Sequence, residues 1–476
     1  MRILDGINNN YSAQKVKGIP KWLVVLMDIA MANLGLYFAF IFASGELQGF
    51  QIATLVILFP MVSLATVFIF SGLGLYSTQR LGFMAVIRSM VTGVLGLTLF
   101  SLIFAFWTRT LIFQRTLFFA APLFQLLLLL SWRLLYWRLE MWISGQKRLL
   151  VIGNRFEANQ VLAKILSLPG ALFEIVAVID TADIASLPLW LGKADSVMIT
   201  GSLGMELKNR VLRLCFDQET EVFIVPDLYE IMLTRAAMTQ VNDIPVIECH
   251  DMKLTFQQFF IKRCFDLLTA FVLLLPAIPL IAFSALVITL TSGGPVFYRQ
   301  ERVGLNGKLF TLYKLRTMIN DAEEVSGPVF STEEDDRVTP IGRFLRATRI
   351  DELPQLYNVL KGDLSIVGPR PERPFFVKQF QEEMDDYKLR HMVKPGITGL
   401  AQVAGFYSTN TNDKLRYDLY YITDYSLLLD FRILLQTIPA LFNREASRGI
   451  SISKQLTQNY PGLEKAFTAE IRKKNK

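Results

Sequence analysis

Four long apolar runs in the first third of the chain constrain its fold more than any other feature. They lie at about 22–44, 52–75, 87–107 and 111–136. Each is about as long as the roughly 20 residues that a helix needs to cross a bilayer. The runs therefore predict a four-helix transmembrane bundle over residues 1–145.

Basic residues around these runs predict the orientation of the bundle. The first loop, around Glu46, has no Lys or Arg, whereas the N-terminal tail, the second loop and the segment after the fourth run are basic. These cations are Arg2, Lys15, Lys17, Lys21, Arg80, Arg88, Arg133, Arg138, Lys147 and Arg148. The positive-inside bias then puts both ends of the bundle in the cytoplasm. Two charges within the runs, Asp28 and Arg115, fit either a transport pair or a helix-end and packing role.

Composition requires soluble domains beside the bundle. With 476 residues, 52% of them hydrophobic, and a mean hydropathy of +0.36, the chain is too apolar for a purely soluble protein and too charged for a purely membrane one. The net charge of +7 suits nucleic acid, an anionic membrane face or phosphorylated substrates. The three cysteines are scattered and the two histidines are far apart, which argues against a zinc site or a disulfide framework.

Residues 146–251 alternate between strands and helices. An apolar strand at about 148–152 runs into Gly153 and a helix to about 167, and further strands follow at about 174–180, 196–200 and 221–225. This alternation predicts a small Rossmann-like parallel α/β domain. Its turn has one glycine where a dinucleotide fingerprint has three, so we favour a scaffold or dimerisation module over a cofactor site.

A fifth apolar run, at about 267–290, opens a C-terminal domain over residues 252–476. It fits either a fifth span or a re-entrant hairpin at about 265–292. Basic residues flank both sides: Lys262 and Arg263 before the run, and Arg299, Arg302 and Lys308 after it. Pro276 and Pro279 lie at its middle, where each removes a helix hydrogen bond. A helix that enters one leaflet, breaks and returns agrees with both facts, and we favour it.

The stretch from Arg343 to Pro371 carries two adjacent carboxylates, Asp351 and Glu352. Neighbouring side chains on a helix point in different directions, so the pair is expected to divide labour and not to share a proton. Four arginines accompany the pair, at positions 343, 346, 349 and 370. Three of them recur at helical spacing, and we expect one cationic face that binds a phosphate bidentately.

Two further segments indicate anion binding. The strand-like stretch 310–318 sends Lys314 and Arg316 to one side. Glycine turns at 394–402, ending in Gln402, are able to bring backbone amides close to a ligand. Beside a membrane hairpin, these features point to a phosphate-bearing substrate at the bilayer surface.

Residues 262 to about 445 resemble the bacterial sugar transferases, the polyprenyl-phosphate hexose-1-phosphate transferases. The matching motifs are Lys262-Arg263-x-Phe265-Asp266, Gly294-Pro295, Arg302-Val-Gly304, Tyr313-Lys314-x-Arg316, Asp351-Glu352-Leu-Pro354-Gln355, Lys361-Gly-Asp363-x-Ser365, Gly368-Pro369-Arg370-Pro371 and Lys394-Pro395-Gly396-x-Thr398-Gly399. The bundle and the α/β domain resemble the large members of the monotopic phosphoglycosyl transferases. Two departures are Ile278-Pro279 in place of Ser-Pro, and Ala401 and Phe406 in place of Trp and Arg, which bears on sugar preference.

The resemblance implies a monotopic α/β catalytic domain with a two-step reaction. Asp351 attacks the diphosphate of a UDP-sugar, releases UMP and holds the sugar phosphate, which undecaprenyl phosphate then accepts. The sugar is glucose or galactose, with an N-acetylated hexosamine as the alternative. The product would start exopolysaccharide, capsule or O-antigen synthesis.

The resemblance also implies roles for other residues and partners. Asp351 and Glu352 would hold Mg²⁺, the expected cofactor. The phosphate-binding residues would be Lys314, Arg316, Arg346, Arg349, Arg370 and Gln402, and the hairpin residues Lys262, Arg263, Pro276 and Pro279. Partners would be the UDP-sugar, undecaprenyl phosphate, membrane lipid and a second copy in a homodimer, with no nucleic acid. The location would be the bacterial inner membrane, with the catalytic domain and both termini in the cytoplasm.

Two other classes of protein remain open from the sequence. A membrane-bound nucleotide-sugar epimerase or dehydratase would use the α/β domain, but it needs a richer glycine fingerprint and a Tyr-x-x-x-Lys pair. A polysaccharide-export or regulatory scaffold would explain the apolar runs. It leaves the arginine-framed pair of Asp351 and Glu352 without a role.

Overall fold

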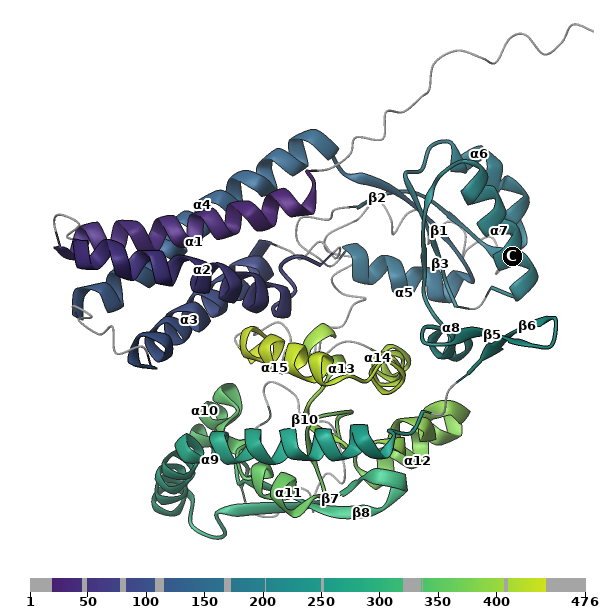
Figure 1. Cartoon of the computed structure of the whole chain (residues 1–476). Coiled ribbons are helices and arrows are strands. Elements are labelled where there is room, and N and C mark those ends of the chain that lie inside the picture. Colours follow the sequence, from purple (N-terminus) through teal and green to yellow (C-terminus); the bar gives the residue numbers. More distant parts are fainter. Residues whose placement is uncertain are drawn as a thin grey trace, which may run out of the picture.

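The computed structural model describes residues 19–44, 49–77, 83–107, 115–166, 173–201, 203–249, 252–319, 335, 337–405 and 410–441. These form a bundle of long helices, a region with a parallel sheet and a mixed C-terminal region, with α13–α15 between the bundle and the rest of that region (Figure 1). Arg2, Lys15, Lys17, Arg80, Phe406, residues 442–476 and the side chain of Arg115 lie outside the described part, and so do the expectations that rest on them.

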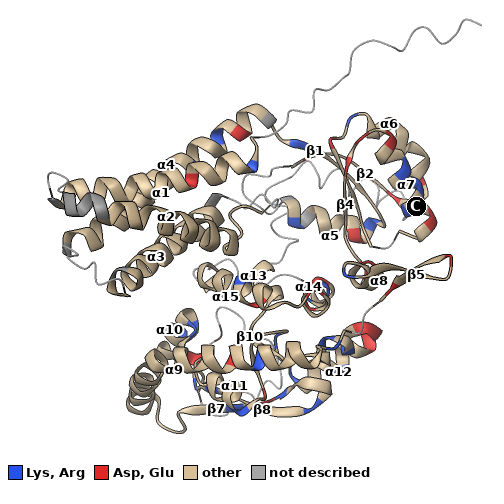
Figure 2. Cartoon of the chain, viewed as in Figure 1, with Lys and Arg blue, Asp and Glu red and all other residues tan. Residues whose placement is uncertain are grey.

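The apolar runs form helices, as predicted. They are α1 (Lys21–Ser44), α2 (Gly49–Gly72), α3 (Phe83–Trp107) and α4 (Arg115–Ser144). All four are long and apolar enough to cross a membrane. Ala32, Leu58 and Leu97 are buried between helices, whereas Leu64 and Leu95 are exposed on their outer surfaces. Figure 2 shows few charged residues along α1–α3, so the outer surface of the bundle is suited to lipid.

A buried ion pair joins α1 and α4, the first and last helices of the bundle. Arg133 on α4 donates from Nε to Asp28 Oδ1 on α1 at 3.1 Å and also contacts the second carboxylate oxygen through Nη2. Arg133 Nη1 donates to the carbonyl of Leu75, in the turn after α2, at 3.4 Å. Asp28 is fully buried, and its charge is paired within the bundle. The contacts therefore give Asp28 a packing role.

The parallel sheet has the strand order β2-β1-β3-β4. Its strands are β1 (Lys147–Ile152), β2 (Phe173–Ile179), β3 (Ser196–Ile199) and β4 (Glu221–Ile224), with α5 (Arg155–Leu166), η1 (Thr181–Ser186), α6 (Leu187–Leu191) and α7 (Met205–Asp217) between them and α8 (Leu228–Leu233) after β4. The four predicted strands and the helix after Gly153 are confirmed to within about a residue or two. A Cβ on Gly153 would lie 1.8 Å from Thr200 Oγ1, so this glycine allows the ends of β1 and β3 to approach closely.

A small antiparallel hairpin, β5 (Ala237–Val241) and β6 (Ile244–Glu248), follows the sheet and was not predicted. It extends away from the sheet (Figure 1). Both strands are too short and too exposed to give a clear alternation of buried and polar residues.

The apolar run of the C-terminal region forms one helix, α9 (Phe256–Ser292), of 37 residues. The predicted break into two helices is wrong, because α9 continues through Pro276 and Pro279. Each proline removes only its own backbone donor, and the hydrogen bonds on either side keep the helix intact. The two halves of α9 run in different directions (Figure 1). Leu268, Phe271 and Leu275 are 66%, 65% and 67% exposed, so this face of α9 requires an apolar environment.

Lys262, predicted as a basic residue at the start of the membrane hairpin, is buried by the protein. Only 5% of its surface is exposed. Its Nζ donates to Asp430 Oδ2 at 2.7 Å, to the carbonyl of Val367 at 3.0 Å and to Tyr421 Oη at 3.1 Å. Lys262 therefore ties α9 to the strand β9 (Ser365–Val367) and to the helices α14 (Thr411–Thr423) and α15 (Leu427–Leu441).

The next residues of the same motif also hold α9 in place. Arg263 donates to the carbonyls of Val359 at 2.7 Å and Leu360 at 2.9 Å, at the end of α11 (Gln355–Lys361). Asp266 Oδ1 accepts from Ser365 Oγ at 2.8 Å. The Lys-Arg-x-Phe-Asp motif is thus an anchor between α9 and the rest of the C-terminal region.

Short elements complete this region. They are β7 (Phe297–Val303), η2 (Leu305–Gly307), β8 (Leu309–Leu315), α10 (Pro340–Thr348), η3 (Ile350–Glu352), α12 (Pro374–Glu383), η4 (Asp385–Met392), β10 (Gly396–Thr398) and α13 (Leu400–Ala404). Strands β7 and β8 pair antiparallel, and β9 and β10 pair parallel. Helix α15 packs on α2 and α3, where Gln436 Nε2 donates to the carbonyl of Gly72 at 3.3 Å. The bundle and the C-terminal region are therefore in direct contact.

We predict that Lys262→Met destabilises the C-terminal region by about 3–5 kcal/mol, because it leaves the buried carboxylate of Asp430 without its cation. Hydrogen exchange of peptides from α9 and β9 in detergent measures the unfolding free energy of this region. Lys378→Met, the same change at an exposed position of α12, should alter it by less than about 0.5 kcal/mol. Equal effects of the two variants would contradict the anchoring role.

Candidate active site

Asp351 and Glu352 lie on a single 3₁₀ turn directly after α10. Arg349 ends α10 in the left-handed conformation, with φ 58° and ψ 16°, and η3 follows. The predicted face of three arginines at helical spacing is therefore wrong, since α10 ends at Thr348 and Arg349 points away from the helical series. Instead, the left-handed backbone at Arg349 changes the direction of the chain, and the Arg349 side chain lies near Glu352, three residues later in the sequence.

Glu352 is surrounded by three cations. Its Oε1 lies 2.8 Å from Lys314 Nζ and 3.6 Å from Arg370 Nη2, and its Oε2 lies 3.6 Å from Arg349 Nη1. These cations come from β8, from the end of α10 and from the loop after β9. Burial alone would raise the pKa of Glu352, but the cations outweigh it and hold the pKa well below its usual range. Glu352 is therefore ionised at neutral pH.

Asp351 has a different environment on the same turn. It is 7% exposed, and within the described residues its Oδ1 is buried without a hydrogen-bond partner. Burial, together with the neighbouring charge of Glu352, raises the pKa of Asp351 to about 6. Buried acceptors are usually satisfied, so the buried, unpaired carboxylate oxygen distinguishes Asp351 from Glu352 on the same turn.

The expected division of labour has a physical basis here. Neighbouring carboxylates whose pKa values are pushed in opposite directions perform different tasks. Glu352 stays ionised and holds the cations. Asp351 has a buried carboxylate oxygen without a hydrogen-bond partner among the described residues, in a cationic setting that suits a base or a nucleophile. The arrangement suits chemistry on a phosphate or diphosphate, whose charge the cations would balance.

Arg346 and Arg316 lie near this turn but have structural contacts. Arg346 Nε donates to Thr317 Oγ1 at 2.9 Å, and burial lowers the pKa of its guanidinium. Arg316 is 7% exposed and donates through Nη2 to the carbonyl of Gly293, which ends α9. Phosphate binding by either residue stays a prediction.

The described hydrogen bonds of Gln402 do not involve Glu352. Its Nε2 donates to the carbonyl of Ile397 at 3.1 Å, and within the described residues its Oε1 is buried without a partner. The expected glycine turns pack on each other, because Gly368 N donates to the carbonyl of Thr398 at 2.8 Å. That amide is therefore not offered to a ligand.

Sequence reasoning missed Asn358, which fixes the strand that carries Lys314. Asn358 is fully buried on α11. Its Oδ1 accepts from Tyr313 N at 3.1 Å, and its Nδ2 donates to the carbonyl of Thr311 at 2.7 Å. A polar residue between apolar Leu356 and Val359 was the available signal, since a buried amide needs such partners.

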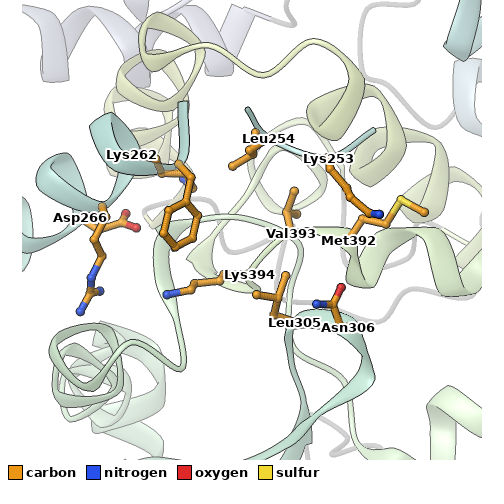
Figure 3. Close-up of a pocket in the computed structure, with 11 residues that line it drawn as sticks. Lys253, Leu254, Lys262, Asp266, Leu305, Asn306, Met392, Val393 and Lys394 are labelled. Atoms are coloured by element: carbon orange, nitrogen blue, oxygen red, sulfur yellow. The ribbon is translucent and has the colours of Figure 1, made fainter. Parts of the chain in front are cut away.

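A separate pocket of about 350 Å³ lies beside the start of α9. Figure 3 shows Lys262 and Asp266 on one side of it and Lys253 with Met392 on the other. Its lining residues are Lys253, Leu254, Phe259, Lys262, Arg263, Asp266, Leu305, Asn306, Met392, Val393 and Lys394. Leu305 and Asn306 form the turn between β7 and β8, whereas Lys314 is near the far end of β8. The pocket is thus distinct from the Asp351 turn.

A comparison with known families matches the region that holds Asp351 and Glu352. Residues 257–444 match the family described as "Bacterial sugar transferase". The chain is 44% identical over 192 residues, 40% of its length, to a UDP-N-acetylgalactosamine-undecaprenyl-phosphate N-acetylgalactosaminephosphotransferase of Aeromonas hydrophila. It is 36% identical over 255 residues, 52% of its length, to a UDP-glucose:undecaprenyl-phosphate glucose-1-phosphate transferase of Escherichia coli. These matches span 45% and 54% of the two relatives, about half of each.

A third relative extends the likeness to the N-terminal half. An undecaprenyl-phosphate galactose phosphotransferase of Salmonella typhimurium is 28% identical over 487 residues, which covers 93% of this chain and 100% of the relative. The likeness to this relative therefore includes the bundle and the parallel sheet.

We predict a pH-dependent stability difference between wild type and Asp351→Asn. The folded protein binds a proton at Asp351 near pH 6 and the unfolded chain only near 3.8, so this residue's contribution to stability is lost as the pH rises between these values. The amide mimics the neutral acid. Asp351→Asn should therefore gain up to about 3 kcal/mol relative to wild type between pH 4 and 7.

Thermal melting followed by circular dichroism at about pH 4.5 and 7.5 would measure this difference. Glu352→Gln should be less stable than wild type by nearly the same amount at both pH values, because the depressed pKa of Glu352 gives stability that is lost only as the pH falls below the ordinary Glu pKa of 4.5. A melting difference for Asp351→Asn that does not change with pH would contradict the raised pKa.

Proposed function

We propose that this chain, which belongs to the bacterial sugar transferase family, transfers a hexose-1-phosphate from a UDP-sugar to undecaprenyl phosphate and releases UMP. Glucose or galactose is the expected hexose, and an N-acetylated hexosamine is the alternative; the relatives' names include all three kinds. The observation that carries the proposal is the buried Oδ1 of Asp351, which has no hydrogen-bond partner among the described residues, next to Glu352 and its three cations. The product would initiate exopolysaccharide, capsule or O-antigen synthesis.

In the proposed first step, Asp351 attacks the sugar-bearing phosphorus of the donor diphosphate. A bond forms between the Asp351 carboxylate oxygen and phosphorus while the bond from phosphorus to the bridging oxygen breaks, and that oxygen leaves with UMP. In the second step, a phosphate oxygen of the lipid attacks the same phosphorus. The bond to Asp351 then breaks, which restores the carboxylate and forms a lipid diphosphate sugar.

Three side chains around Glu352 would bind and orient the diphosphate. Lys314, Arg349 and Arg370 already converge on one carboxylate. Guanidinium groups match phosphate oxygens bidentately, so donor phosphates entering beside Glu352 would meet preformed positive charge. Arg370 and Arg349 are the more exposed of the three, at 40% and 44% of their side chains, and are best placed to meet the donor.

Mg²⁺ is the cofactor that we propose for this site. Among the described residues, no cluster of three acidic, His or Cys side chains could hold a metal alone. Mg²⁺ is commonly held by one or two carboxylates together with substrate phosphates and water. The carboxylate of Asp351, whose Oδ1 has no hydrogen-bond partner among the described residues, fits that mode together with Glu352. When bound, the ion would neutralise charge on the diphosphate.

The remaining regions support a membrane-surface enzyme in this proposal. We place it in the bacterial inner membrane, with α9 re-entering the cytoplasmic leaflet through a bend at Pro276 and Pro279. The parallel sheet region would be a Rossmann-like scaffold without chemistry of its own, and the assembly a homodimer. The exposed apolar face of α9 and the apolar helices α1–α4 support the membrane contacts.

The proposed topology predicts that tags at residues 10 and 476 both report cytoplasm. The reason is the basic flanks of the apolar runs, together with an α9 that returns to the side it entered. Reporter fusions active on only one side of the membrane would measure this. A periplasmic signal from residue 476 with a cytoplasmic one from residue 10 would show that α9 crosses.

The function itself predicts one lipid product. The purified protein would be offered a panel of UDP-sugars with undecaprenyl phosphate and Mg²⁺, and lipid products identified by mass spectrometry. Asp351→Asn should abolish turnover, since an amide is a far weaker nucleophile. Glu352→Gln should be nearly as damaging, because it removes the charge that gathers the cations. Asp385→Asn, the same change at an exposed position, should keep full activity.

The covalent intermediate is tested by withholding the lipid. Radiolabelled sugar phosphate should then remain on wild type and not on Asp351→Asn, and double-reciprocal plots should be parallel. Label that persists on Asp351→Asn, or that needs both substrates, would favour direct transfer with Asp351 as a metal ligand or base. No lipid product from any UDP-sugar would overturn the proposed function.

A further inference from the structure

The loop after β9 holds Arg370 at the active site. Arg370 Nη2 lies 3.6 Å from Glu352 Oε1, while its neighbours Pro369 and Pro371 have restricted φ angles. A long side chain can be held in one position only if its backbone is also fixed. The position of this guanidinium therefore depends on what holds the three residues 369–371.

Three successive carbonyls of this loop each accept a hydrogen bond from a different donor. The carbonyl of Pro369 accepts from Gly396 N at 2.9 Å. The carbonyl of Arg370 accepts from Arg390 Nη2 at 2.9 Å, and that of Pro371 from Arg302 Nη1 at 2.9 Å. Arg390 is thus the residue that holds the backbone of Arg370 itself.

Arg390 is itself fixed on its other sides. It is 5% exposed on η4. Its Nε donates to Asp418 Oδ2 on α14 at 2.9 Å, and its Nη1 donates to Tyr387 Oη at 2.7 Å. The planar fork of a guanidinium makes these contacts in three directions at once, which an ammonium on a flexible stem does not reproduce.

A purely stabilising role explains this arrangement poorly. Burying an ion pair is expensive, and well-packed apolar residues are often as stable as the pair they replace. The pair of Arg390 and Asp418 does provide a rigid donor at a defined point, and that donor meets the carbonyl of Arg370. The same fork contacts α14, whose Asp413 and Arg416 bond to the parallel sheet region through Lys164 and Asp227.

We propose that Arg390 is a positioning residue that acts through Arg370: it fixes the carbonyl of Arg370 and so sets the place of the Arg370 guanidinium beside Glu352. In its consequence for catalysis the inference rests on the proposed function. Arg390 touches neither Glu352 nor Asp351 in any described contact, so its effect must pass through the loop.

The first arm of the test does not depend on activity. Hydrogen exchange is measured for a peptide covering residues 368–373 in wild type, Arg390→Lys and Tyr387→Phe. Arg390→Lys keeps the positive charge beside Asp418 but loses the fork, and exchange should accelerate about tenfold or more. Tyr387→Phe removes one partner of Arg390 and leaves its bond to the Arg370 carbonyl, so exchange should stay within about threefold. Unchanged exchange in Arg390→Lys would overturn the proposal.

The second arm is a double-mutant cycle on kcat/KM with the sugar that the panel identifies. Arg390→Lys should lower kcat/KM about 30-fold, on the order expected when a charge is displaced by about 1 Å. Adding it to Arg370→Lys should lower the value by no more than about threefold further, because the residue through which it acts is already changed. If the double variant instead lost kcat/KM by the product of the two single losses, Arg390 would act through general stability, and the proposal would be overturned.

Failures of the two ideas are distinguishable. If wild type makes no lipid product, the proposed function fails, and the exchange arm still decides whether Arg390 holds the loop. If Arg390→Lys does not fold, Asp418→Asn takes its place in both arms, since it removes the charge that orients Arg390 and leaves the guanidinium present. Faster loop exchange and a non-multiplying cycle are expected for this variant too.

Discussion

The buried ammonium of Lys262 is the contact on which the C-terminal region depends. It lies on α9 and reaches the carbonyl of Val367, the hydroxyl of Tyr421 and the carboxylate of Asp430. A single charge thus joins a long apolar helix to a strand and two helices. Removing it would leave Asp430 uncompensated, and burying an unpaired charge costs several kcal/mol. The apolar helix is therefore held to the domain by polar contacts, which leaves its hydrophobic face free for lipid.

That fixed frame explains how neighbouring carboxylates come to behave differently. The strand β8, tied to α11 by Asn358, brings Lys314 to Glu352, and the reversal at Arg349 adds a second cation. Asp351 shares the turn but not the ion pairs, so burial dominates its pKa. A difference in environment within one turn is enough to push the pKa values of two neighbouring carboxylates in opposite directions.

Long periodic patterns were readable from the sequence, whereas contacts between distant segments were not. The apolar runs and the strands of the parallel sheet were predicted because length and alternation decide them locally. The burial of Lys262 was not, since a cation before an apolar run fits a membrane surface equally well, and only its partner Asp430, 168 positions later, distinguishes the two. The positive φ angle of Arg349 could not be predicted from the sequence either. The residues Arg346-Ala-Thr-Arg349 do not predict a left-handed backbone, because Arg rarely adopts that conformation.

The candidate site was located from the sequence, but its geometry was not. Residue types gave Asp351, Glu352 and a set of cations, and three of those cations do meet at Glu352. Arg316 belongs to the same strand pattern as Lys314, yet it contacts the end of α9, because the strand ends at Leu315 and the alternation no longer fixes where the next side chain points. The residues that place the cations, Asn358 and Arg390, carry no motif that reveals their role. They are recognisable only as polar groups that would be costly to bury without the backbone carbonyls and amides they satisfy. That same requirement lets Asn358 hold the strand β8 and Arg390 hold the loop after β9 in one position.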